Sequence, residues 1–219
     1  MSNRDLAKFL DNANHNAEST KAQIEKLCQE VLQYGFNAAF VNSCWVEFAK
    51  SILGENGKVG TVVSFPLGQD STEVKINSCL ALIGDGADEL DISANVGWLR
   101  SGMEEKYFGE LQDIVRAVRN RKEETIVKFI IEAYFLDPKE IKRASKMVMD
   151  SGADFVKTTS GFGPRDAKIE YVKLIKEVVG DRVKIKAAGG ISTAEQVKKY
   201  LAAGACRIGT SKAVEIVGG

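Results

Sequence analysis

The sequence predicts a single-domain (β/α)8 barrel, or TIM barrel, that spans residues 1–219. Short apolar segments alternate with helical patterns along the whole chain, in about eight strand–helix units. No G-x-G-x-x-G motif follows the first strand, which argues against the alternative of a doubly wound open sheet that binds a dinucleotide. Polar residues also recur at the C-terminal ends of the expected strands, where barrels place their active sites. These residues are Asn42, Asp91, Glu132, Lys157 and Lys186.

In the first half of the chain, short apolar runs predict strands, and apolar residues at helical spacing predict helices. Thr20 begins a helix with Gln23 three residues later as a capping box, and Gly35 ends it. The expected strands are residues 9–11, 38–41, 59–63 and 89–92. The expected helices are residues 20–34, 45–53, 71–83 and 102–120.

The same alternation continues through the second half. Pro138 sits in the first turn of a helix that begins near Asp137, a position where its missing N–H has no consequence. The expected strands are residues 125–131, 155–157, 183–186 and 207–209. Further helices are expected at residues 168–179, 193–203 and 212–217. No linker, short-period repeat or low-complexity segment interrupts this pattern, so we expect one domain.

The charge balance excludes some classes of partner. Lys and Arg together number 30, as do Asp and Glu, so the formal net charge is zero. Such a chain lacks the basic surface typical of proteins that bind nucleic acid or anionic membranes. With 44% hydrophobic residues it can bury a sizeable core, and its zero net charge weakly favours self-association.

The cysteines and the N-terminus indicate a cytoplasmic protein. The four cysteines are scattered and form no C-x-x-C pair, and a single histidine leaves no Cys/His cluster that would bind a metal. Residues 1–12 contain neither an apolar signal region nor an Arg-rich amphipathic stretch. No apolar run is long enough to span a bilayer. We therefore expect no export, no membrane association and no metal.

Three strand ends carry the residues of a candidate catalytic site. Side chains two residues apart on a strand share a face, so Asp91, Lys157 and Lys186 converge at the barrel mouth if these faces point inward. A nearby cation and a low-dielectric pocket lower the pKa of a lysine, which lets its neutral amine attack a carbonyl. Lys186 would act on Lys157 in this way. The resulting iminium accepts electrons from an adjacent carbon–carbon bond, with Asp91 as an acid/base.

Small residues after the last three strands predict a phosphate site. Barrels frequently bind phosphate in these loops, through backbone N–H groups and a short helix N-terminus. Turn glycines without a ligand are the alternative interpretation. The candidate phosphate-binding residues are Ser160, Gly161, Gly189, Gly190, Gly209, Thr210 and Ser211.

Several stretches, in order along nearly the whole chain, resemble the deoxyribose-phosphate aldolase family. They include the segments around Asn42, Asp91, Lys157 and Lys186, and the segment 207–211. The resemblance implies a class I aldolase that needs no cofactor. Its expected reaction is reversible cleavage of 2-deoxy-D-ribose 5-phosphate to D-glyceraldehyde 3-phosphate and acetaldehyde.

The resemblance also implies residue roles. The lysine matching Lys157 forms the Schiff base, the one matching Lys186 perturbs it, and the aspartate matching Asp91 takes part in proton transfer. Asp11 and Asn42 are expected to contact the substrate. A homodimer is expected from the family together with the zero net charge.

The first strand departs from the family pattern. Asp11 is retained, but Ala13 replaces a hydroxyl residue, and a polar run at residues 14–16 replaces an apolar one. We interpret His15 as a solvated loop residue, with a site role as the alternative. Lys184 shares a face with Lys186 and is expected to pair with Glu89 or to reach the barrel floor.

These departures leave two further hypotheses open. The same iminium chemistry could act on a different phosphorylated sugar or aldehyde. Alternatively, the protein could bind sugar phosphates with little catalysis, a hypothesis motivated by the hydroxyl missing at Ala13.

Overall fold

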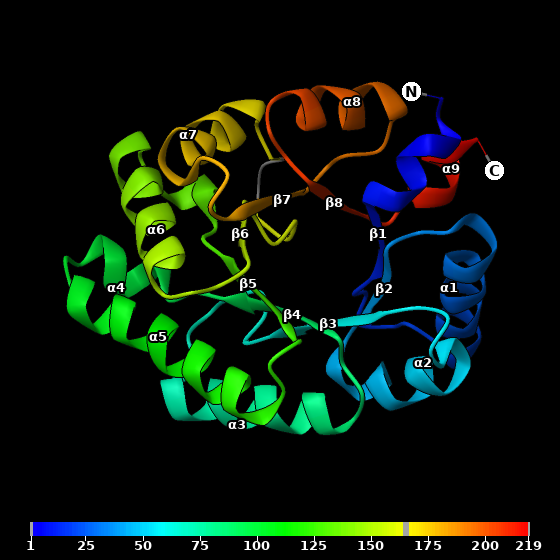
Figure 1. Cartoon of the computed structure of the whole chain (residues 1–219), viewed down its shortest axis with the longest axis horizontal. Helices are drawn as coiled ribbons and strands as arrows, with labels where there is room; N and C mark the ends of the chain where they lie inside the picture. Colours follow the sequence, from blue (N-terminus) through cyan, green and yellow to red (C-terminus); the bar gives the residue numbers. More distant parts are fainter. Residues whose placement is uncertain (1, 164–166, 219) are drawn as a thin grey trace.

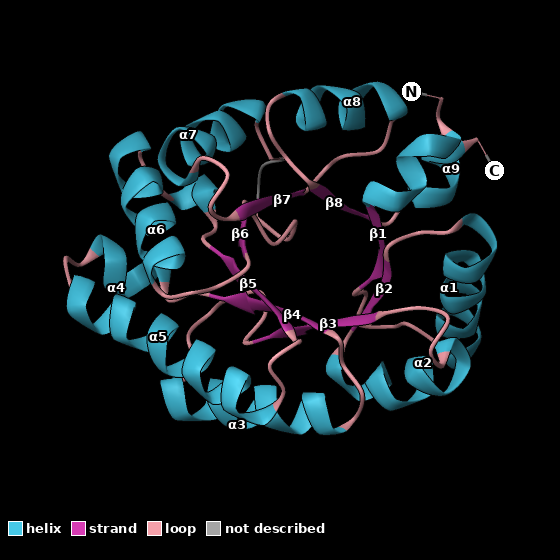
Figure 2. Ribbon diagram, viewed as in Figure 1, coloured by secondary structure: helices cyan, strands magenta, loops and turns pink. Residues whose placement is uncertain are grey.

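The protein forms a closed barrel of eight parallel strands surrounded by helices (Figures 1 and 2). A computed structural model describes residues 2–163 and 167–218. Each strand pairs with the next one in the sequence, and β8 pairs with β1, which closes the barrel. The strands are β1 (Leu10–Asn14), β2 (Ala38–Val41), β3 (Val59–Val63), β4 (Glu89–Ser93), β5 (Ile126–Ile130), β6 (Phe155–Lys157), β7 (Lys184–Ala188) and β8 (Arg207–Thr210). The predicted fold class is therefore confirmed, and the open-sheet alternative is wrong.

The outer layer consists of helices that follow the strands. These are α1 (Lys21–Tyr34), α2 (Val46–Leu53), α3 (Thr72–Gly84), α4 (Val96–Arg100), α5 (Glu104–Arg121), α6 (Pro138–Asp150), α7 (Ile169–Val179), α8 (Ala194–Ala202) and α9 (Ala213–Val217). Short 3-10 helices lie before β1, after β2 and after β5: η1 (Arg4–Phe9), η2 (Ser43–Trp45) and η3 (Ala133–Phe135).

The structure corrects the element predictions at a few places. The first strand covers residues 10–14 rather than 9–11, because Phe9 belongs to η1. The helix expected at 102–120 begins at Glu104, and the separate helix α4 precedes it. The side chain of Asn95 accepts the N–H of Trp98 and so caps this short helix, a local bond that apolar periodicity does not reveal.

Helix ends follow the signals in the sequence. Thr20 and Gln23 form the predicted capping box of α1, and Gly35 ends the helix in the left-handed conformation. Asp137 accepts the N–H groups of Lys139 and Glu140 and forms a second capping box at the start of α6. These bonds satisfy donors that a helix leaves open in its first turn, and they fix where each helix leaves its strand.

The hydrophobic core lies between the sheet and the helices, whereas the barrel interior carries charge. Buried aliphatic side chains such as Ile24, Leu90 and Val156 fill the outer layer. Buried charged residues of the strands, including Lys128 and Glu89, point into the barrel. Buried charges need partners, so the barrel interior must be a connected polar network.

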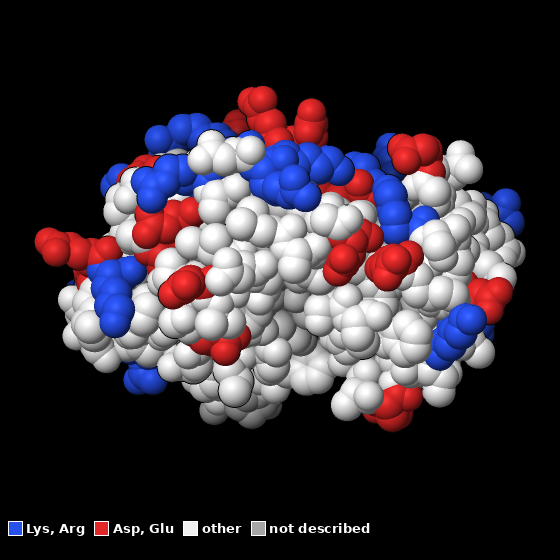
Figure 3. All heavy atoms as spheres, turned by 90° about the horizontal axis from the view of Figure 1, so that it is seen from below, with Lys and Arg blue, Asp and Glu red and all other residues white. Residues whose placement is uncertain are grey.

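The surface mixes acidic and basic side chains. Figure 3 shows both kinds on one side of the molecule, with Lys and Arg gathered along the upper rim of that view. Among the helices of residues 2–163 and 167–218, none has the length and apolar character needed to cross a membrane.

Candidate active site

Lys157, Lys186 and Asp91 meet inside the barrel, as the strand pattern predicts. Lys157 Nζ lies 2.8 Å from Asp91 Oδ2, and Lys186 Nζ lies 2.7 Å from the same oxygen. Lys157 and Lys186 are register partners on β6 and β7. Neighbouring parallel strands therefore hold the two amines side by side, and one carboxylate oxygen accepts from both.

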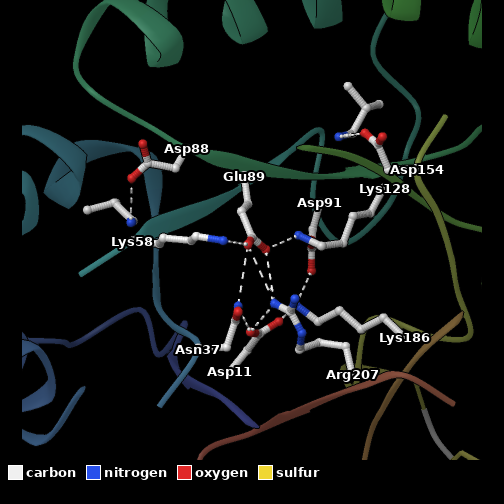
Figure 4. Close-up of polar contacts among 12 residues, drawn as sticks. Asp11, Asn37, Lys58, Asp88, Glu89, Asp91, Lys128, Asp154, Lys186 and Arg207 are labelled. Carbon is white, nitrogen blue, oxygen red and sulfur yellow. Dashed lines mark hydrogen bonds and ion pairs between the residues drawn. The ribbon is translucent and has the colours of Figure 1, made fainter. Parts of the chain in front are cut away.

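A second group of charges lies around Glu89 and Asp11 (Figure 4). Lys128 donates to Glu89 Oε2 at 2.6 Å and lies 3.1 Å from Asp91 Oδ1. Arg207 Nη1 lies 3.0 Å from Asp11 Oδ1 and 3.4 Å from Glu89 Oε2. Lys186 Nζ lies 2.7 Å from Asp11 Oδ2, so it joins this group to Asp91.

The partners of Glu89 in this network are Lys128 and Arg207. Lys184, for which a pairing with Glu89 was one expectation, is exposed and places its amine 5.7 Å from the Phe155 ring.

The environment separates the pKa values of these groups. Burial, helped by the Lys186 cation, lowers the pKa of Lys157 to about 8, against the opposing effect of Asp91. Burial raises the pKa of Asp91, but Lys128, Lys157 and Lys186 outweigh it and hold that pKa well below its usual range. For Lys128, the carboxylates Asp91 and Glu89 overcome burial and raise the pKa.

Charge balance around Lys157 helps to account for its lowered pKa. The buried carboxylates Asp11, Glu89 and Asp91 are matched in number by the cations Lys128, Lys186 and Arg207. A charged Lys157 would add an uncompensated positive charge to a buried site. Burial also raises the pKa of Asp11, and any protonation there would increase this positive excess.

Lys157 and Lys186 face a cavity of about 470 Å³ at the barrel mouth. All seven predicted phosphate-binding residues line it, namely Ser160, Gly161, Gly189, Gly190, Gly209, Thr210 and Ser211. Two of their polar groups already have protein partners. The N–H of Ser160 donates to both oxygens of Glu132 at 3.1 and 3.2 Å, and the Thr210 hydroxyl donates to the Ile191 carbonyl at 2.6 Å.

Gly189 shows why this wall needs glycine. Its φ is +105°, a conformation that side chains rarely allow. A Cβ on Gly189 would lie 2.9 Å from Thr159 Oγ1 and 3.3 Å from the Ala167 nitrogen. The backbone at Gly189 therefore packs against the segment after β6 with no room for a side chain, and Gly161 and Gly189 both line the cavity.

The two other predicted substrate contacts lie outside the cavity lining. Asp11 is fully buried, with its oxygens facing Lys186, Arg207 and Asn37. Asn42 instead lines a neighbouring hollow beyond β2 and β3. Their placement depends on the stagger of strands around the barrel, which the sequence pattern does not specify.

Sequence reasoning missed an aromatic wall beside Lys157. The rings of His15 and Phe65 lie 5.3 Å apart, Phe65 and Phe162 lie 5.3 Å apart, and Lys157 Nζ lies 5.6 Å from the Phe65 centroid. His15 lines the cavity, so its interpretation as a solvated loop residue is wrong.

Phe40 was also missed; it lines the cavity from below, with Lys186 Nζ 3.5 Å from its ring centroid. A Cβ on Gly60 of the next strand would overlap the Phe40 ring, so that glycine makes room for it. A glycine on β3 beside an aromatic residue on β2 is the one sequence signal that could have indicated this packing.

Comparison with known proteins identifies the family of this chain. Residues 6–212 match the model of a family described as DeoC/LacD family aldolase. The deoxyribose-phosphate aldolase of Caldicellulosiruptor saccharolyticus is 44% identical over 218 residues, which cover 99% of each chain. The protein of the same name from Thermococcus gammatolerans is 42% identical over 100% of this chain and 98% of its own.

Solved structures give the same result. A structure described as QR15, an aldolase, superimposes with a TM-score of 0.91 and 36% identity, over 97% of this chain and 94% of that one. A deoxyribose phosphate aldolase from Aeropyrum pernix, described as having a unique tetrameric structure, gives a TM-score of 0.90 and 28% identity, over 99% and 91% of the two chains. This chain belongs to the DeoC/LacD aldolase family, and it is a lyase.

Proposed function

We propose that this protein cleaves 2-deoxy-D-ribose 5-phosphate reversibly to D-glyceraldehyde 3-phosphate and acetaldehyde, through a Schiff base on Lys157. The single observation that carries the proposal is a buried lysine with a pKa lowered to about 8, facing a cavity whose other wall is built of small-residue loops. The names of the relatives support the choice of substrate.

The reaction begins with the neutral amine of Lys157. It adds to the C1 aldehyde of the open-chain sugar, and the carbinolamine loses water to give an iminium. The bond between C2 and C3 then breaks, and its electron pair moves toward the iminium nitrogen to form an enamine. The C3 hydroxyl loses its proton as C3 becomes the aldehyde of glyceraldehyde 3-phosphate. Protonation of the enamine at C2 and hydrolysis release acetaldehyde and regenerate Lys157.

Asp91 and Lys186 have separate roles in this scheme. The low pKa of Asp91 keeps it ionised, so in the resting site it orients the Lys157 amine and accepts its hydrogen bond. We assign to Asp91 the passing of protons between the amine, the carbinolamine oxygen and bound water. Burial and, in addition, repulsion by the Lys186 cation lower the pKa of Lys157, so that a larger fraction of its amine is neutral.

The backbone loops after β6, β7 and β8 are proposed to hold the phosphate. Backbone N–H groups of these loops, the Ser211 hydroxyl and the Lys212 amine of the same cavity lining are the donors that we assign to it. The N–H of Ser160 and the hydroxyl of Thr210 already donate to Glu132 and to the Ile191 carbonyl. The phosphate group of the substrate is bound but takes no part in the reaction, and hydrogen-bond donors of this kind suit such an anion.

Covalent trapping tests the Schiff base. Incubation with acetaldehyde and borohydride should reduce the iminium and leave an ethyl group on Lys157, which peptide mass spectrometry locates. An unmodified protein, or modification only at other lysines, would refute the mechanism.

A coupled assay of deoxyribose 5-phosphate cleavage tests the activity. Lys157→Leu should lower turnover by on the order of a thousandfold or more while the protein stays folded. Lys184→Leu is the matched control, because Lys184 is an exposed lysine at the start of β7, away from the cavity lining. Full turnover by Lys157→Leu would remove Lys157 from the mechanism.

The second hypothesis, a different phosphorylated sugar or aldehyde, has its own observation. Ala13, His15 and Asn16, where the chain departs from the family pattern, all line the cavity. A panel of phosphorylated aldoses, each followed by aldehyde release, separates it from the first. Binding of glyceraldehyde 3-phosphate without turnover of any aldol would favour the third hypothesis, a sugar-phosphate-binding paralogue.

The expected homodimer and cytoplasmic location stay predictions. Light scattering after size exclusion measures the oligomeric state directly, and a mass of about 48 kDa, twice the chain mass of 23.9 kDa, is the result expected for the homodimer. The monomer or a tetramer, as described for the Aeropyrum pernix protein, would contradict it.

A further inference from the structure

A second hollow lies beside the cavity at the barrel mouth. It has a volume of about 330 Å³, within the range of small-molecule pockets, and it lies over the ends of β4 and β5. We call it the β4–β5 hollow. Gln69 and Arg100 bring polar groups to it, but much of its surface is apolar. The apolar residues apart from Phe162 are Pro66, Leu67, Ala94, Val96, Ile130 and Phe135.

The β4–β5 hollow begins one strand away from the reactive amine. Ile130 of β5 and Lys157 of β6 are register partners, so their backbones lie about 5 Å apart and their side chains share one face of the sheet. Ile130 lines the hollow, whereas Lys157 lines the cavity. A group bound next to Lys157 would therefore reach either space if nothing stood between them.

Phe162 stands between the two spaces. Among the described residues, Ser160 and Phe162 are the two that line both the cavity and the β4–β5 hollow. Ser160 has a small side chain and is 8% exposed, whereas Phe162 carries a ring and is 56% exposed. The Phe162 ring is therefore the larger part of the barrier.

Hydrogen bonds and one ring contact hold Phe162 in this position. Its N–H donates to the Ser160 hydroxyl at 3.0 Å, and the Ser160 N–H donates to Glu132 at 3.1 and 3.2 Å. The ring meets Phe65 edge-on, with the two centroids 5.3 Å apart. Phe162 lies outside the hydrophobic core, so a smaller residue in its place should leave the fold intact.

We propose that Phe162 is a specificity-determining residue that keeps the apolar chains of acceptor aldehydes out of the β4–β5 hollow. The inference rests on the proposed aldolase function and deepens it. In the synthetic direction, the enamine carbon held by Lys157 bonds to the carbonyl carbon of the acceptor, and the carbonyl oxygen takes up a proton. Hydrolysis of the resulting iminium then releases the product.

The rest of the acceptor must extend away from the new bond. With Phe162 in place, the space open to it is the polar cavity that leads to the proposed phosphate-binding loops. That space suits a phosphorylated acceptor, but it offers an apolar chain little surface against which to leave water. Without the ring, the chain would gain the apolar lining of the β4–β5 hollow.

Two acceptors that differ only in chain length test this role. Acetaldehyde is added to propanal or to hexanal, and chromatography measures the products, 3-hydroxypentanal and 3-hydroxyoctanal. The readout is the kcat/KM for hexanal divided by that for propanal, a ratio to which phosphate binding does not contribute. We expect Phe162→Ala to raise this ratio about tenfold or more, because the longer chain enters the opened hollow.

Controls separate this effect from a general loosening of the mouth. Phe162→Tyr keeps an aromatic ring and should keep the wild-type ratio. Phe135→Ala is the matched control, because Phe135 is 48% exposed and lines the β4–β5 hollow but not the cavity. While Phe162 is present, this variant should also keep the wild-type ratio.

Thermal unfolding checks that each variant is folded. If Phe162→Ala fails to fold, Phe162→Leu takes its place, with a smaller increase expected. A wild-type ratio in the folded variant, or an equal increase in Phe135→Ala, would overturn the role of Phe162. No addition of acetaldehyde to glyceraldehyde 3-phosphate by the wild type would instead overturn the proposed function, and the inference with it.

Discussion

Lys157 shows how reactivity and stability oppose each other at a single residue. Its pKa is about 8 in the folded protein, whereas an exposed lysine has a pKa near 10.5. The unfolded chain therefore binds more protons between these values, so stability rises as the pH increases from about 8 to about 10.5. Below pH 8 the unfavourable contribution of Lys157 to the stability of the folded state is complete, because folding must either bury the charged amine or release its proton.

Removing the amine should relieve this contribution. We expect Lys157→Met to abolish activity and to leave the free energy of unfolding at pH 7 unchanged or raised, by up to about 3 kcal/mol. Asp91 would still be paired with Lys186 and Lys128, so no carboxylate is left alone. Urea unfolding of both proteins measures the difference. A marked loss of stability would show that the Lys157–Asp91 contact is a net stabilising ion pair.

The effect of Lys186 on Lys157 is visible in the pH dependence of catalysis. The rate of the free enzyme should rise with pH as Lys157 loses its proton, with a midpoint near the folded pKa of about 8. Lys186→Met removes a repelling cation, so the midpoint should move upward by about one pH unit. Profiles of kcat/KM from pH 6 to 10 compare the two. An unchanged midpoint would mean that burial alone sets the pKa of Lys157.

Residues on strands were predictable in a way that loop residues were not. The two-residue period of a strand places Lys157, Lys186 and Asp91 on inward faces, and the structure confirms their convergence. His15 follows the end of β1, where no period fixes the direction of a side chain. Asp11 lies on the inward face, but its depth depends on barrel stagger, so its buried contacts with Arg207 and Lys186 could not be foreseen.

At the scale of one element, the loop after β7 should tolerate little change. Gly189→Ala places a Cβ against Thr159 and the Ala167 backbone in a conformation unfavourable for alanine. We expect it to reduce stability by about 1–3 kcal/mol and to raise KM for the phosphorylated substrate, since the cavity wall must shift. Steady-state kinetics and thermal unfolding together measure both effects.

A second glycine provides the matched comparison. Gly35 ends α1 with a φ of +69°, and a Cβ there would meet nothing within 4 Å. Gly35→Ala should therefore reduce stability by about 1 kcal/mol through backbone strain alone and leave KM unchanged. Equal effects of the two substitutions on KM would mean that the crowding at Gly189 has no part in binding.

Element predictions succeeded where local signals and tertiary packing agree. Residues 38–41, 59–63 and 155–157 form strands with the predicted bounds, because each is a short apolar segment bounded by polar or glycine residues. The prediction missed α4, whose five residues are too few to show a helical period. Its start depends on the cap by Asn95, a polar residue that equally suits a loop.

At the scale of the whole molecule, the ionic barrel interior should make folding sensitive to acid. The pKa values of Glu89 and Asp91 are lowered in the folded state, although burial alone would raise them. Their contribution to stability is thus complete above the pKa of the unfolded carboxyls, near 4, and it is lost as the pH falls through the folded values. Asp11 acts in the opposite direction, since burial raises its pKa.

Denaturant midpoints at pH 7, 5 and 3 measure this sensitivity. We expect little change from pH 7 to 5 and a clear fall by pH 3. Asp91→Asn should flatten that fall, because the carboxyl with the strongly lowered pKa is gone. A midpoint that is constant down to pH 3 would show that the paired charges are not coupled to folding.

Barrel closure has a consequence for chain connectivity. The closing seam is the pairing of β1 with β8, and η1 packs beside α9 at the same place (Figure 1). The two ends of the fold are therefore neighbours. The exposed turn between α5 and β5 precedes a strand, so it lies at the end of the barrel opposite Lys157, which is the last residue of β6. A circular permutant that joins the old ends through a short linker and opens at Glu123 would keep every strand pairing. We expect such a permutant to retain aldolase activity, because the order of the elements along the chain would change while the barrel and its site would not.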